Sequence, residues 1–172
     1  MKRKLDFLYE SKNQNRLLTE EERNFLKSQG LVLVGSSGGR NINDIDCFKY
    51  AELLISNKYG FNFKTRLQEI IVRLIEKADQ SVFLDVPPDD FKDLEYLVIY
   101  YSVESHLKKL VRVTHTGVLI RLEEYYPAII SKLGNLNIFV HTIDNELIAR
   151  MYSDAINENR LFLSVDRILQ EA

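Results

Sequence analysis

Hydrophobic positions in the chain recur with the spacing of amphipathic helices in some segments and form short unbroken runs in others. The clearest amphipathic segment is 65–79, where apolar residues recur every three or four positions and predict a helix. Those apolar residues are Leu67, Ile70, Ile71, Leu74 and Ile75. Further helices are predicted over 48–57, 103–113, 125–133 and 145–155, and in the tail from 166.

Short apolar runs lie between these segments and predict strands. The predicted strands cover 31–34, 81–86, 97–102, 118–122, 137–142 and 161–165. Most of them show no alternation of polar and apolar residues, which is typical of strands buried on both faces of a parallel sheet. Strands that alternate with helices along the chain favour the same arrangement.

The first thirty residues have their own start and stop signals. Thr19 and Glu22 have the spacing of a capping box, in which each side chain serves a free backbone N–H of the other residue. Gly30 follows the apolar residues of this segment and is suited to the position just after a helix. We therefore predict one α/β domain over 1–172, with a helical segment at 1–29 and a body at 30–172 built on a mostly parallel sheet with helical crossovers.

Composition and charge narrow the classes of function. The chain has 172 residues and 23 Lys+Arg against 25 Asp+Glu, so its net charge of −2 gives no reason to expect a nucleic-acid partner. The single cysteine, Cys47, leaves no internal disulfide to form, and no apolar run is long enough for a signal peptide or a membrane span. We expect a soluble cytoplasmic protein.

A glycine-rich segment follows the first predicted strand. Gly35, Ser36, Ser37 and Arg40 could bind a phosphate through backbone N–H groups and a guanidinium. The segment matches neither the dinucleotide-binding pattern nor the P-loop, and a plain glycine-rich turn is the alternative.

Three aspartates suggest a second kind of site. Gly35-Ser36 at a strand end, then Asp44-Ile-Asp46 and the strand residue Asp85, resembles the nucleotidyltransferase superfamily. The resemblance implies that Asp44, Asp46 and Asp85 hold a divalent metal, Mg²⁺ or Ca²⁺, for phosphoryl transfer. The alternative is that the first two aspartates serve as turn and N-cap residues.

The C-terminal part resembles another family. The segment from Ile138-Phe-Val-His-Thr-Ile-Asp-Asn145 to Asp166 is similar to the penultimate strand and helix and the last strand of glycerophosphodiester phosphodiesterases. Lys64-Thr-Arg-Leu-Gln-Glu69 resembles that family's Thr-Leu-x-Glu helix start, and the similarity covers about 62–168. It implies a partial or degenerate TIM-like barrel, because the chain is too short for eight βα units and lacks the family's His-Arg-Gly and Glu-x-Asp motifs.

These resemblances lead to a first hypothesis of a phosphodiesterase-like protein that acts on or binds a phosphorylated small molecule. His141 and Asp85 would face this ligand, while the segment from Gly35 to Arg40 would hold the phosphate. A metal-dependent nucleotidyltransferase and a non-enzymatic interaction module remain as alternatives. His115 is expected in a loop, because it lies in a Thr-His-Thr-Gly sequence that is typical of a turn.

Overall fold

The computed structural model describes residues 6–14, 16–35, 45–77, 83–105, 110–122, 126–133, 137–148 and 160–172. Within these ranges it has seven strands and five helices. The strands are β1 (Val32–Gly35), β2 (Phe83–Leu84), β3 (Tyr96–Ser105), β4 (Leu110–Leu122), β5 (Tyr126–Lys132), β6 (Ile138–Thr142) and β7 (Arg160–Ser164). The helices are α1 (Asp6–Asn13), α2 (Glu20–Ser28), α4 (Cys47–Tyr59), α5 (Leu67–Glu76) and α7 (Val165–Glu171).

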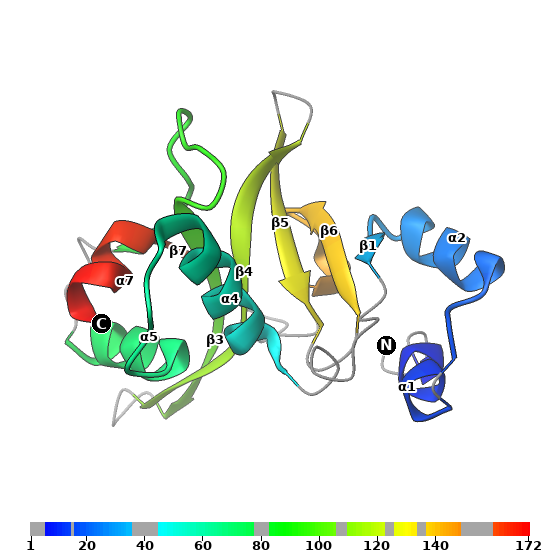
Figure 1. Ribbon diagram of the computed structural model, residues 1–172, viewed down its shortest axis with the longest axis horizontal. Helices are drawn as coiled ribbons and strands as arrows, with labels where there is room; N and C mark the ends of the chain where they lie inside the picture. The colour runs from blue at the N-terminus through cyan, green and yellow to red at the C-terminus, as the bar shows by residue number, and fades with distance from the viewer. Residues whose placement is uncertain are drawn as a thin grey trace.

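All seven strands belong to one antiparallel sheet in the order β1-β6-β5-β4-β3-β7-β2, which does not close into a barrel. The predicted mostly parallel sheet and the TIM-like barrel are therefore wrong. Figure 1 shows α4, α5 and α7 on one side of the sheet near β3, β4 and β7, whereas α1 and α2 lie beyond β1 at the other end. Strands β3 to β6 follow one another as neighbours, so hairpins replace the expected helical crossovers.

Two predicted helices are strands in the structure. The described residues of the segment 103–113 end β3 and begin β4, and nearly all of 125–133 is β5. β-branched residues such as Val111, Val113 and Thr114 favour the extended backbone there, and this preference outweighs the helical spacing of the leucines and lysines nearby. Of the predicted helix 145–155, residues 146–148 are helical, Asn145 precedes them without being part of the helix, and residues 149–155 lie outside the described residues.

The two faces of the sheet belong to different hydrophobic cores. Alternate residues of β3 divide between them: Val98 lies in the core with Leu26 of α2, while Ile99 lies in the core with Ile55 of α4 and Ile71 of α5. We call the first side the N-terminal face and the second the helical face. Burial on both sides, which was predicted, is thus achieved by an antiparallel sheet.

The helices α4 and α5 over the helical face correspond to the predicted segments 48–57 and 65–79, with ends that differ by one to three residues. The carboxylate of Asp46 accepts a hydrogen bond from Lys49 N and caps α4, and Gly60 ends that helix with a positive φ of 62°. In α5 four of the five residues with helical spacing are buried, and the fifth, Ile75, is half-buried. No helix within the described residues is long and apolar enough to cross a membrane.

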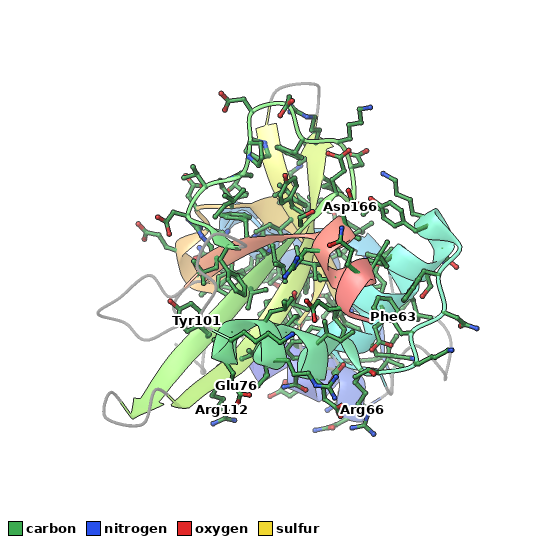
Figure 2. The ribbon with its side chains drawn as sticks, turned by 90° about the vertical axis from the view of Figure 1, so that its left-hand side faces the viewer. Phe63, Arg66, Glu76, Tyr101, Arg112 and Asp166 are labelled. Carbon is green, nitrogen blue, oxygen red and sulfur yellow. The ribbon has the colours of Figure 1, made fainter. Side chains whose placement is uncertain are left out.

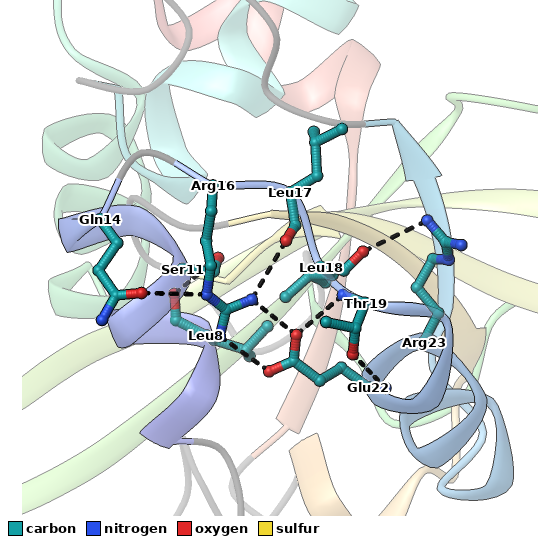
Figure 3. A network of polar contacts seen from close by, with 9 residues as sticks. All are labelled: Leu8, Ser11, Gln14, Arg16, Leu17, Leu18, Thr19, Glu22 and Arg23. Atoms are coloured by element: carbon teal, nitrogen blue, oxygen red, sulfur yellow. Dashed lines mark hydrogen bonds and ion pairs between the residues drawn. The ribbon is translucent and has the colours of Figure 1, made fainter.

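The predicted capping box is present at the start of α2 (Figure 3). Glu22 N donates to Thr19 Oγ1 at 3.1 Å, and Thr19 N donates to Glu22 Oε1 at 2.9 Å. Arg16 adds a two-pronged ion pair to the Glu22 carboxylate at 2.7 and 3.1 Å. Hydrogen bonding from Arg16 lowers the pKa of Glu22 to about 2. Gly30 follows the helix with a φ of 78°, as the sequence predicts.

Strands β4 and β5 approach each other closely at Gly117. A Cβ atom at this glycine would lie 2.4 Å from Ile129 Cγ2 and 3.0 Å from Ser131 Cβ. Gly117 therefore allows the strands to pack against each other beside the polar side chains of the N-terminal face.

Candidate functional site

Five polar side chains from five consecutive strands gather on the N-terminal face. They are Tyr100 of β3, His115 of β4, Ser131 of β5, His141 of β6 and Arg160 of β7. Tyr100 is paired in register with His115 on one side and with Arg160 on the other, which places the three side chains on one face. We call these five residues the histidine cluster. The first four of them are at most 2% exposed.

The imidazole of His115 lies at the centre of this cluster. Its Nε2 is 3.2 Å from Ser131 Oγ, and its ring centroid lies 5.6 Å from that of Tyr100. Burial and, to a smaller extent, the charge of His141 lower the pKa of His115 to about 3. The imidazole is therefore neutral at physiological pH.

His141 has one ring nitrogen engaged by the fold and one that is not. Its Nδ1 lies 2.8 Å from the carbonyl oxygen of Thr142, which can only accept, so Nδ1 carries the hydrogen. Nε2 of the neutral ring is then an acceptor, and it has no hydrogen-bond partner among the described residues. Burial lowers the pKa of His141 to about 4; the bond to Thr142 opposes this shift and the charge of Arg160 adds to it.

Arg160 brings a cation to the same place. Its guanidinium donates to the carbonyl oxygen of Ile143, just beyond β6, and lies 5.7 Å from the centre of the Phe162 ring. Three strands separate β7 from β6 in the sheet order, which would be about 19 Å on a flat sheet with neighbours about 4.8 Å apart. The sheet must therefore curve so that the N-terminal face lies inside. Nε of Arg160 finds no acceptor within the described part of the chain.

The structure separates the residues that were predicted to form one phosphodiesterase site. His141 lies in the histidine cluster, but Asp85 is exposed just after β2 at the opposite edge of the sheet. Gly35 ends β1. Ser36, Ser37, Arg40 and Asp44 lie outside the described residues, so the predicted phosphate loop stays a prediction.

The predicted metal site is not assembled by the described carboxylates. Asp46 caps α4, over the helical face, while Asp85 follows the edge strand β2. The described residues contain no group of three histidine, cysteine, aspartate or glutamate side chains that could hold a metal ion. A divalent metal therefore remains a prediction that rests on the sequence alone.

A shallow hollow of about 420 Å³ lies beside Asp46 on the other side of the molecule. Its lining residues are Ile45, Asp46, Phe48, Lys49, Glu52, Arg66 and Gln68. Figure 2 shows Arg66 at one end of α5 and Glu76 at the other. The buried carboxylate in this hollow, Glu52, accepts from Leu67 N at 2.8 Å and from Lys49 Nζ at 3.0 Å, so it serves the start of α5. The hollow offers a ligand only groups that the fold already uses or that face solvent.

Sequence reasoning identified one member of the histidine cluster as a site residue and missed the others. His115 was expected in a loop. It lies instead within β4 and is completely buried, with 0% of its surface exposed. The alternation of His115, Gly117 and Leu119 along β4 is the signal that could have placed the His115 side chain on the face of Leu119, which lies in the same core as Tyr100. Arg160 carried no local signal, because only the register of β7 against β3 brings it to the cluster.

Comparison of the chain with protein-family models, with curated proteins and with solved structures found no match. The fold implied by the resemblance to phosphodiesterases is absent. We therefore base the functional argument on the chemistry of the histidine cluster.

Proposed function

We propose that this protein binds a phosphorylated small molecule on the N-terminal face, through Arg160 and His141. The observation that carries the proposal is the buried Nε2 of His141, which has no partner among the described residues and lies beside a guanidinium. A buried polar atom without a partner is uncommon in folded proteins and often marks a functional site.

The two groups suit different atoms of one ligand. The guanidinium of Arg160 is a fork of N–H donors that fits phosphate oxygens. Nε2 of neutral His141 accepts, so it calls for a donor such as a sugar or glycerol hydroxyl or the P–OH of a phosphate monoanion. A phosphorylated compound with a neighbouring hydroxyl group supplies both.

The proposal assigns binding and no bond-breaking step. Asp85, the predicted catalytic partner of His141, is exposed outside the cluster, and the charge that acts on His141 comes from Arg160. The nucleotidyltransferase alternative has no supporting geometry among the described carboxylates. A non-enzymatic role through a bound small molecule agrees best with this arrangement.

Calorimetric titration with glycerol 3-phosphate, glycerophosphocholine, inorganic phosphate and uncharged glycerol tests the proposal. We expect a phosphorylated compound to bind and glycerol to bind much more weakly. Arg160→Gln should weaken binding by about tenfold or more, as expected when a charged hydrogen bond is lost. Arg112→Gln, on an exposed arginine of β4, is the matched control and should bind as the wild type does.

Two results would contradict this function. One is the absence of binding by any phosphorylated compound, and the other is unchanged affinity in a folded Arg160→Gln variant.

A further inference from the structure

We infer that His141 and His115 form a proton-sensitive lock on the N-terminal face, which stays closed while both imidazoles are neutral and opens when acid charges them. The inference does not depend on the proposed ligand, since it concerns the fold alone.

The geometry leaves little room for a charged His141. The side chain is 2% exposed, and its Nδ1 hydrogen is already given to Thr142 O. The only place for a further proton is Nε2, which has no acceptor among the described residues. A new cation there would be buried without a hydrogen-bond partner, which is strongly unfavourable.

The groups that face His141 add to this cost. β7 contributes the guanidinium of Arg160, and β4 contributes the imidazole of His115, which would be a second cation once protonated. β3 contributes the phenol of Tyr100, whose pKa burial raises to about 12, so it carries no negative charge to compensate. β5 contributes the uncharged Ile129, which is paired with His141 in register.

The direction of the effect follows from these surroundings. Both histidines bind a proton less readily in the folded chain than the ordinary histidine of an unfolded chain, whose pKa is about 6.5. The stability they contribute is complete above pH 6.5. It declines as the pH falls from there towards about 4 for His141 and about 3 for His115.

Strands β6 and β7, which the histidine cluster links, should separate first. Arg160 links β7 to the carbonyl of Ile143 directly after β6, next to His141. Repulsion between two neighbouring cations would act on this bridge. We therefore expect β6 and β7 to separate on the N-terminal face before the helical face is disturbed.

Native-state hydrogen exchange between pH 7.5 and 4.5, in buffers free of phosphate, tests the lock. After correction for intrinsic rates, amides of β6 and β7 should open at least about tenfold more often at pH 5 than at pH 7.5. His141→Gln and His115→Gln should each reduce this pH dependence. His106→Gln is the matched control, because it removes an imidazole that is not among the five side chains of the cluster, and it should behave as the wild type.

Imidazole NMR of the wild type keeps the test decisive if the glutamine variants do not fold. We expect His115 and His141 to remain neutral down to below pH 5. The lock is overturned if either imidazole titrates near pH 6.5, or if folded glutamine variants keep the full pH dependence. Failure of phosphate compounds to bind would leave these readouts unchanged, so the two proposals are tested separately.

Discussion

On the helical face, the buried carboxylate of Glu52 has both oxygens engaged, one by Leu67 N and the other by Lys49 Nζ. On the N-terminal face, the equally buried His141 uses one nitrogen and has no described partner for the other. The same sheet thus buries polar groups in two ways. Glu52 completes the local structure of a helix, whereas His141 and Arg160 on the other side retain hydrogen-bonding capacity that the described fold does not use. That difference separates a structural face from a candidate binding face.

Truncation of the core on the helical face should have the largest effect. Ile99→Ala removes a side chain that is 0% exposed between β3 and the covering helices, and we expect a loss of about 2–5 kcal/mol in the free energy of unfolding. Urea unfolding measures this loss, and Leu53→Ala, at a position 41% exposed, is the control with a much smaller cost. A cost for Ile99→Ala no larger than that of the control would mean that the core on the helical face is not tightly packed.

Removal of the Glu52 carboxylate tests whether polar burial on the helical face is structural. Glu52→Ala leaves Leu67 N without its acceptor and should cost about 1.5–3 kcal/mol. Glu52→Gln keeps an acceptor oxygen and should cost clearly less in the same chemical denaturation measurement. Equal costs for the two variants would assign the role to the charge of Glu52 and its pair with Lys49 instead.

Removal of the Arg160 guanidinium tests the N-terminal face in the same way. Arg160→Met leaves the carbonyl of Ile143 without its donor, and we expect a loss of about 1–2 kcal/mol at pH 7.5. The loss should shrink as the pH falls, because the variant no longer places a cation beside His141. If the stability cost of Arg160→Met grew as the pH fell, the proposed repulsion between Arg160 and protonated His141 would be contradicted. The exposed-site variant Arg112→Met provides the reference.

Disruption of the capping box of α2 should have a smaller effect on stability, and this effect should depend on pH in a lower range than that of the histidines. Glu22→Ala should cost about 0.5–1 kcal/mol at pH 7, because Thr19 N and Arg16 lose their acceptor. The carboxyl pKa is lowered to about 2, so the stabilisation is complete above about pH 4.5 and is lost as the pH falls towards 2. Thermal unfolding at pH 7, 5 and 3 separates this carboxyl effect from the histidine effect, which lies at higher pH. Retention of the full difference between wild type and variant at pH 3 would contradict this role of the Glu22 carboxylate.

Local features of the fold could be predicted from the sequence. The capping box at Thr19, the helix around Ile70 and the glycine after α2 each depend on residues a few positions apart, and the structure confirms them. The direction of the strands could not be predicted in this way. An apolar run such as Leu31–Val34 indicates burial on both faces, but antiparallel and parallel neighbours satisfy that burial equally well. The hairpin of β3 and β4 also required tertiary packing to overcome residues that favour a helix.

The candidate site was predictable only where a single strand revealed it. His141 stands at the end of an apolar run, and this position alone drew attention to it. Tyr100 and His115 face each other because of a register between two strands, and Arg160 joins them through a third strand far along the chain. Such pairings are set by the whole sheet, so these residues could not be grouped from their positions along the chain.

The sheet order also has a consequence for how the chain can fold during synthesis. The short strand β2 pairs only with β7 among the described strands, although 75 residues lie between Leu84 and Arg160. β2 therefore has no neighbour to join until the ribosome has made residues 160–164, whereas β3, β4, β5 and β6 can form successive hairpins as they emerge. We expect pulse-labelled nascent chains to protect the amides of β4 and β5 early and those of β2 and β7 last.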